Sequence, residues 1–292
     1  MHRVSTLIFG ALAIGSVCFG AETVTPVPTL VASESVLHSP EQETTKIRMH
    51  HLNRLSEHLT KTPETLRFHC RYESDIATLP PSRQVALTFD DGPEPGQTEH
   101  ILEILAKYRI HATFFLIGSK AAEHPELVEK IKASGQHIIG NHSWNHPNFH
   151  DISEEEQANE IKKTTDLLEK VGGYTRFFRY PYGNSSCEAN ALLHSTGYAI
   201  VGWHIDSCDW AFDKTGVVDV QEATSCGVLP QNRSDYVEHV VASVRAHNGG
   251  IVLMHEIHAN TVKQLDHIIA RVLADGFVFS LITAQGFQPS LR

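Results

Sequence analysis

The alternation of short apolar segments with helical patterns beyond residue 81 is the feature that most restricts the fold of this chain. Seven apolar segments have the composition of strands: residues 85–88, 112–116, 137–140, 176–180, 199–203, 251–254 and 277–279. Six segments have helical periodicity: residues 98–108, 125–134, 154–171, 188–195, 235–246 and 261–274. Strands separated by helices run parallel, so the pattern predicts an α/β fold, a distorted (β/α) barrel of about seven parallel strands.

The first 20 residues have the pattern of an export signal. Arg3 is followed by an apolar run at residues 7–19, and Cys18-Phe19-Gly20 is acceptable as a cleavage site. The run is too short to span a bilayer and no second long run follows, so we expect no transmembrane segment. The alternatives are a buried helix and a lipid anchor at Cys18. We expect a signal peptide at residues 1–20 and an exported protein, periplasmic or secreted.

Residues 21–80 differ in composition from the rest of the chain. Val, Thr, Pro and Ser are frequent up to about residue 40 without periodicity, as in a linker. A helical spacing of apolar residues then predicts one helix near residues 41–59. We therefore expect a small N-terminal helical extension at residues 21–80 and the main domain at residues 81–292.

Charge and cysteine content narrow the class of protein. The net charge of −10 argues against a nucleic acid partner. Of the five cysteines, four remain once Cys18 is removed, and an even number in an exported chain suggests disulfides with three possible connectivities. Cys208 and Cys226 bracket a loop with Gly and Asp, so we pair them, and we pair Cys70 with Cys187. Four free thiols are the alternative.

Polar motifs follow the carboxyl ends of the predicted strands, the face where (β/α) barrels build their active sites. They are TFDDG at 88–92, HSWNH at 142–146, RYPYG at 179–183, DSCDW at 206–210 and LMH at 253–255. Residues far apart in the sequence are thereby expected to meet. Together they supply candidates for a metal triad, a general base and a general acid, which predicts metal-assisted hydrolysis.

Asp91, His142 and His146 are the candidate metal ligands. Two imidazoles and one carboxylate suit Zn²⁺ with a position left open for water, and other divalent transition metals fit the same donors. The histidine spacing alone is weak, because 20 histidines produce such pairs by chance and it aligns the rings only in a helix. Asp90 and Asp91 end an apolar strand before Gly92, so their carboxylates leave the sheet at a turn.

With these motifs the chain resembles the polysaccharide deacetylases that have a NodB homology domain, the fourth carbohydrate esterase family. TFDDGP from Thr88 and HSWNHPN from His142 are close matches to the family's motifs. The resemblance covers residues 83–288, and the N-terminal 80 residues lie outside it. It implies a zinc-dependent hydrolase in which Asp91, His142 and His146 bind the metal.

The resemblance also implies roles for the remaining motif residues. Asp90 takes a proton from the attacking water, with Arg179 orienting it. The backbone N–H of Tyr182, beside Pro181, meets the oxyanion. His255 protonates the leaving amine. Its carboxylate partner is Asp209, with Asp206 as the competitor, and the substrate pocket is formed by Trp210, Leu253 and Pro181.

The expected substrate is a glycan polymer. The resemblance together with export implies removal of acetyl groups from N-acetylated amino sugars, with N-acetylglucosamine of peptidoglycan as the first choice. Chitin oligomers and acetylated xylan are the alternatives. From a different class, a non-catalytic exported glycan-binding protein would keep the barrel without turnover, but such a protein would be expected to lose a ligand, the base or the acid.

Overall fold

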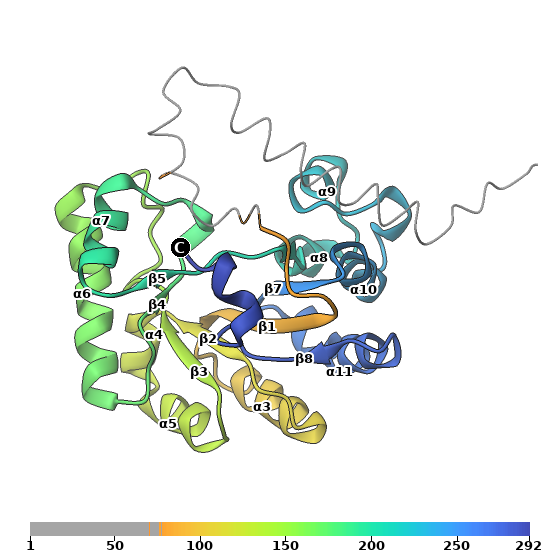
Figure 1. Cartoon of the computed structure of the whole chain (residues 1–292), viewed down its shortest axis with the longest axis horizontal. Helices are drawn as coiled ribbons and strands as arrows, with labels where there is room; N and C mark the ends of the chain where they lie inside the picture. Colours follow the sequence, from red (N-terminus) through yellow and green to blue (C-terminus); the bar gives the residue numbers. More distant parts are fainter. Residues whose placement is uncertain (1–69, 71–75, 77) are drawn as a thin grey trace, which may run out of the picture. The chain divides into compact units, whose positions relative to one another are not determined.

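Eight parallel strands form one sheet, which follows the path β5-β4-β3-β2-β1-β7-β6, with β8 paired to the beginning of β1 (Figure 1). The computed structural model describes residues 70, 76 and 78–292, so the predicted signal peptide and N-terminal helix lie outside the described residues. The strands are β1 (Gln84–Gly92), β2 (Thr113–Leu116), β3 (Ile138–Asn141), β4 (Phe177–Phe178), β5 (Ala199–Ile200), β6 (Ile205–Asp206), β7 (Gly249–His255) and β8 (Val278–Phe279). The prediction of a distorted barrel of parallel strands is confirmed. It missed β6 and made the fifth strand too long.

Helices surround the curled sheet (Figure 1). They are α3 (Gln97–Tyr108), α4 (Gly118–Glu123), α5 (Pro125–Ala133), α6 (Glu154–Val171), α7 (Cys187–Ser195), α8 (Asp209–Thr215), α9 (Val220–Cys226), α10 (Tyr236–His247) and α11 (Ala259–Ala274), with 3-10 turns η1 (Pro181–Gly183), η2 (Pro230–Asn232) and η3 (Gln285–Ser290). The six predicted helices are confirmed to within about two residues at each end. The short helices α4, α8 and α9 were not predicted. None of the described helices is long and apolar enough to cross a membrane.

The period-two alternation of β1 separates two cores. Val85, Leu87 and Phe89 pack in the cluster between the sheet and the helices. Ala86 packs in a second cluster with side chains of the neighbouring strands, and Ile282 and Phe287 of the C-terminal segment belong to this cluster as well. The even-numbered positions of β1 therefore face the barrel interior, which places Asp90 at the end of an interior column.

The sheet has a seam between its two edge strands. β5 and β6 are the ends of the path, and the chain passes from one to the other through residues 201–204. Arg179 lies against this connection, where its Nε donates to the Val201 carbonyl at 3.1 Å and its Nη2 to the Gly202 carbonyl at 2.9 Å. Its buried guanidinium thus satisfies backbone groups that a continuous ladder would pair.

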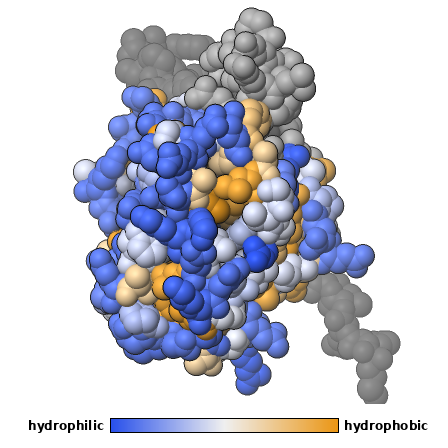
Figure 2. Space-filling view, turned by 90° about the vertical axis from the view of Figure 1, so that its left-hand side faces the viewer, coloured by the Kyte–Doolittle hydropathy of each residue, from blue (hydrophilic) through white to orange (hydrophobic). Residues whose placement is uncertain are grey.

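The face shown in Figure 2 is largely hydrophilic, and its apolar colour is confined to separate areas. α6 lies on this side of the molecule. Its buried residues, Gln157, Ile161, Thr164 and Leu168, recur at helical spacing and form one stripe, while most other positions are polar. Ser153 caps the helix by accepting a hydrogen bond from the Glu156 backbone N–H.

Strands β1 and β7 are joined at their carboxyl ends by Glu256. Its backbone N–H donates to the Asp90 carbonyl at 2.9 Å, and its fully buried carboxylate accepts a hydrogen bond from the Thr98 hydroxyl. Burial raises the pKa of Glu256 to about 8, although the Thr98 hydrogen bond opposes this shift. The carboxylate fills the space beside Gly92, where a Cβ atom would lie 1.7 Å from Glu256 Oε1.

We predict that Gly92→Ala destabilises the protein by about 1–3 kcal/mol, because the added methyl group overpacks this contact. In a Glu256→Ala background the same substitution should cost much less, since the space is then open. Urea unfolding of the two single variants and the double variant measures the coupling. An equal cost in both backgrounds would contradict the steric explanation.

Candidate functional site

A β-bulge brings Asp90 and Asp91 to the same side of β1. The register of β1 with β2 shifts between Asp90 and Gly92, and Asp91 has a left-handed φ of 69°. Strict alternation would direct adjacent side chains to opposite faces. The bulge turns Asp91 toward the same cavity as Asp90.

Asp91, His142 and His146 form a compact set of metal donors. His142 Nε2 lies 3.4 Å and His146 Nε2 lies 3.2 Å from Asp91 Oδ1, and donor atoms of all three residues lie within 4.8 Å of one another. His142 Nδ1 lies 2.8 Å from the Arg179 carbonyl oxygen, which can only accept, so Nδ1 carries the proton and the Nε2 lone pair faces Asp91.

The charge state of this set suits a divalent metal. Burial raises the pKa of Asp91, but the nearby imidazoles of His142, His255 and His146 outweigh it and hold the pKa below its usual value. Burial and the neighbouring His142 lower the pKa of His146 to about 4, which leaves it neutral at pH 7. Asp91 Oδ1 is buried and has no hydrogen-bond partner among the described residues. An ionised carboxylate with an unsatisfied oxygen, beside two imidazoles, fits a bound cation.

The two histidines meet through a loop and not through a helix. Residues 142–146 follow β3, and Ser143 and His146 both have positive φ values. Asn141 accepts from the Ser143 N–H at 2.9 Å, and Ser143 accepts from the His146 N–H at 3.0 Å. Glu160 of α6 accepts from the next two N–H groups, of Trp144 and Asn145, at 2.8 and 2.7 Å. The hydrogen-bonded loop, and not a helical spacing, therefore brings the two rings close in space.

Asp90 is held by Arg179 from the barrel interior. Arg179 Nη1 donates to Asp90 Oδ1 at 2.8 Å and to the Thr88 hydroxyl at 2.7 Å. The guanidinium lies over the Phe115 ring at 4.3 Å and is fully buried. Asp90 Oδ2 is 3.7 Å from His142 Nε2. Asp90 therefore lies beside the donor set of Asp91, His142 and His146 but does not belong to it.

His255 and Asp209 form a second buried pair. Asp209 Oδ1 lies 2.7 Å from His255 Nδ1, and Asp209 Oδ2 accepts from the His255 backbone N–H at 2.7 Å. The Thr261 hydroxyl and the Trp210 N–H also donate to this carboxylate. Burial lowers the pKa of His255, but the Asp209 carboxylate outweighs it and raises the pKa above its usual range.

Asp206, the competing carboxylate, has a different contact. Its Oδ1 accepts from the Cys208 backbone N–H at 2.7 Å, and its carbonyl accepts from His239 Nε2 at 3.0 Å. Asp206 lines the cavity, but the carboxylate that accepts hydrogen bonds from His255 is that of Asp209.

Most of the candidate site residues line one cavity of about 550 Å³. Its lining combines the metal donors and Asp90 with aromatic and apolar side chains: Asp90, Asp91, His142, His146, Tyr180, Tyr182, Gly183, Trp203, Asp206, Trp210, Leu253, His255, Ile257 and His258. Tyr182 is exposed and its ring packs against His146 at 4.7 Å. Arg179 and Asp209 are not part of this lining and contact it through Asp90 and His255. Pro181 is buried in η1 outside this lining, which does not fit its predicted place in the pocket.

A family model described as polysaccharide deacetylase matches residues 78–201. A peptidoglycan-N-acetylglucosamine deacetylase of Bacillus cereus is 32% identical over 204 residues, which cover 68% of this chain and 86% of that protein. The chain belongs to the polysaccharide deacetylase family. The resemblance inferred from the five motifs is therefore confirmed.

Other polysaccharide deacetylase relatives differ in length and in activity. The peptidoglycan-N-acetylglucosamine deacetylase of Listeria monocytogenes is 32% identical over 202 residues, which are 69% of this chain but only 38% of that longer protein. A family 4 carbohydrate esterase pseudoenzyme of Bacillus anthracis has a solved structure with a TM-score of 0.59 and 26% identity, covering 71% of this chain and 66% of that one. The same fold thus occurs with and without catalysis.

Several lining residues of this family member were not among the site residues assigned from the sequence. Trp203 lies in the connection from β5 to β6, and Tyr180 follows Arg179 with its hydroxyl donating to Asn190 at 2.7 Å. Ile257 and His258 follow β7. The available signal was position, because each follows the carboxyl end of a strand, as the motif residues do.

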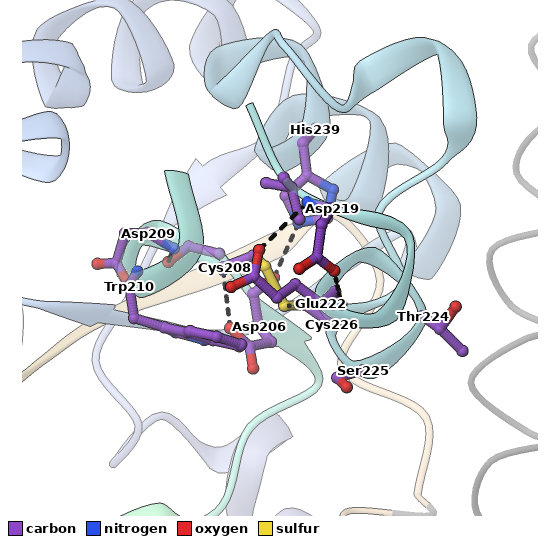
Figure 3. Close-up of a disulfide and its surroundings, with 12 residues drawn as sticks. Asp206, Cys208, Asp209, Trp210, Asp219, Glu222, Thr224, Ser225, Cys226 and His239 are labelled. Carbon is purple, nitrogen blue, oxygen red and sulfur yellow. Dashed lines mark hydrogen bonds between the residues drawn. A yellow bond between two sulfur atoms is a disulfide. The ribbon is translucent and has the colours of Figure 1, made fainter. Parts of the chain in front are cut away.

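Both predicted disulfides are present, Cys70–Cys187 and Cys208–Cys226. Figure 3 shows Cys208 directly before Asp209 and Trp210, with Cys226 of α9 bonded to it. Cys208 is fully buried and has a left-handed φ of 57° at the start of α8. The disulfide therefore anchors the residue next to Asp209.

We predict that replacing Cys208 and Cys226 together by Ser lowers the free energy of unfolding by about 3 kcal/mol, since the bond closes an 18-residue separation. It should also loosen the Asp209–His255 hydrogen bond. The His255 Nδ1 proton, followed by NMR in the folded variant, should exchange faster with water. The Cys70/Cys187 double Ser variant is the matched control, which should lose stability but keep that proton protected. Equal exchange in both variants would contradict the anchoring.

Proposed function

We propose that the protein is a zinc-dependent polysaccharide N-deacetylase, which hydrolyses acetamide groups of N-acetylated amino sugars in a glycan polymer. The observation that carries this proposal is the convergence in one cavity of an Asp-His-His donor set, a carboxylate held by arginine, and a histidine held by a carboxylate. Each group has a separate task in amide hydrolysis.

The resident metal is assigned to Asp91, His142 and His146. The fit rests on the buried, unpartnered Asp91 Oδ1 and on the Nε2 atoms that face it. When bound, a divalent ion supplies Lewis acidity toward a carbonyl oxygen and toward water. Zinc suits two imidazoles and one carboxylate with a further position open.

Asp90 is the general base. Its Oδ1 is engaged by Arg179, which leaves Oδ2 on the side of the metal donors to accept a proton from the attacking water. Arg179 is a positioning residue, because its side chain is fully buried and its guanidinium orients Asp90 through a hydrogen bond. A positioned base contributes about 10²–10⁴ in rate.

His255 is the general acid and Tyr182 supplies an oxyanion donor. His255 Nε2 gives its proton to the departing amine nitrogen, while Asp209 holds Nδ1 and stabilises the imidazolium. The backbone N–H of Tyr182 is the proposed donor to the carbonyl oxygen, which is supported by the position of Tyr182 in the cavity lining between Pro181 and Gly183. Trp210 and Leu253 form the wall for the acetyl methyl group and the sugar ring.

We propose N-acetylglucosamine of peptidoglycan as the substrate. Two relatives that carry this activity in their names support the choice, as does the export pattern of residues 1–20. The proposed location of the protein is the periplasm or the exterior of the cell. The proposed domain division is an N-terminal extension at residues 21–80 and the deacetylase domain at residues 81–292. The metal, base and acid residues are all present, which favours catalysis over a glycan-binding role.

The test is acetate release from peptidoglycan, chitin oligomers and acetylated xylan, measured side by side with zinc-loaded protein. We expect the highest rate on peptidoglycan. A preference for chitin oligomers or for xylan would change the substrate to that polymer, and in the case of xylan the reaction would be ester hydrolysis. Glycan binding without acetate release would replace the enzyme by the non-catalytic alternative.

Asp90→Asn and Asp91→Asn should separate base from ligand. Asp90→Asn keeps the side-chain shape but cannot accept the proton, so we expect turnover to fall by about two to four orders of magnitude with zinc retained. Asp91→Asn should lose zinc as well. Zinc content and acetate release are measured on the same samples. Greater zinc loss in Asp90→Asn would reverse the two assignments.

Asp209→Asn should shift the alkaline limb of the pH–rate profile to lower pH. The acid works only as imidazolium, so the rate falls as pH rises through the pKa of His255. Asp209 raises that pKa, and removing its charge must lower it. Asp206→Asn is the control and should leave the limb in place. A shift in Asp206→Asn alone would transfer the partner role to Asp206.

A further inference from the structure

Two imidazole–carboxylate pairs lie side by side where α8 meets the end of β7. Asp209 and Asp213 are four residues apart on α8, and the facing histidines, His255 and His258, precede α11. His258 Nδ1 lies 3.4 Å from Asp213 Oδ2, and the two imidazole ring centres are 5.4 Å apart. Asp213 Oδ1 also accepts from the Asn260 N–H at 3.2 Å, which fixes it against the beginning of α11.

In both pairs the carboxylate faces Nδ1. His255 Nδ1 is 2.7 Å from Asp209 Oδ1. His258 Nδ1 faces Asp213 in the same way. Among the described residues the hydrogen bond or ion pair of each ring is made by Nδ1, and neither Nε2 atom takes part in a hydrogen bond. A histidine whose Nδ1–H is held by a carboxylate is the usual form of a metal-ligating histidine, because the partner fixes the ring and leaves the Nε2 lone pair available.

Position and charge make this pair accessible to a cation. His255 and His258 both line the cavity, and a donor atom of each lies within 4.8 Å of the other and of Asp209. The described lining includes the carboxylates of Asp90, Asp91 and Asp206 but neither lysine nor arginine. Such a wall raises the local concentration of divalent ions.

We infer that His255 and His258 form a second divalent-metal site whose occupation inhibits the enzyme. The ion takes the Nε2 lone pairs of both rings, so any proton on His255 Nε2 is released to water and none remains for the leaving amine. This site is weaker than the one at Asp91. Asp209 already accepts from His255, Trp210 and Thr261, so no free carboxylate oxygen of this residue is available as a direct ligand.

Zinc binding alone tests the site without reference to activity. Equilibrium dialysis against increasing zinc should give two equivalents for the wild-type protein, one tight and one weak. His258→Ala and His258→Gln should bind only the tight equivalent, and His142→Ala should lose the tight one. His267→Ala, which removes an exposed histidine of α11, is the matched control and should bind two. A single equivalent in the wild type, or two in both His258 variants, would overturn the proposal.

The inhibitory effect rests on the proposed deacetylase function and is tested separately. Acetate release should fall about tenfold when free zinc exceeds the second dissociation constant tenfold, by simple mass action. The ratio of rates at excess and at stoichiometric zinc should stay near one in both His258 variants. Undiminished wild-type activity with two equivalents bound would overturn the inhibitory role. Absence of acetate release at stoichiometric zinc would instead refute the deacetylase function and leave the dialysis result unaffected.

Discussion

The buried guanidinium of Arg179 is the interaction on which the rest of the site depends. It bonds the carbonyls of Val201 and Gly202 at the seam of the barrel and the side chains of Thr88 and Asp90 on β1. The backbone carbonyl oxygen of Arg179 lies 2.8 Å from His142 Nδ1, and this contact selects the imidazole tautomer whose Nε2 lone pair faces Asp91. A charge with no exposed surface is tolerable only when it is paired and fully hydrogen bonded. Arg179 therefore couples closure of the sheet to the orientation of both Asp90 and His142.

The sequence predicted the long elements and the motif positions because both depend on local patterns. α6 and α11 have long amphipathic stripes, and the central strands are continuous apolar runs. β6 has two residues and α8 has seven, too few to establish a period. Their location is imposed by pairing with β7 and by the Cys208–Cys226 bond, both of which are non-local. Trp203 was missed for the same reason, since it lies in the short connection between two edge strands.

The arrangement of the two adjacent carboxylates could not be predicted in detail. From sequence, Asp90 and Asp91 were placed at a turn after the strand, but β1 continues to Gly92. In a regular strand one of them would face the helices, where an ionised carboxylate is costly. The bulge at Asp91 avoids that cost. The residue types do not predict this bulge, because the left-handed φ of Asp91 arises only when the strands pair in the folded sheet.

The spacing between the proposed base and acid follows from strand register. Asp90 of β1 and His255 of β7 are direct partners in the parallel ladder, so their backbones are separated by one inter-strand distance, about 4.8 Å. Behind them, Arg179 orients Asp90 from the barrel interior while Asp209 orients His255 from α8. A slip of one residue between the strands would turn one of the two side chains to the opposite face. The Glu256 N–H bond to the Asp90 carbonyl extends the ladder by one more residue at this end, which holds the register where the chemistry requires it.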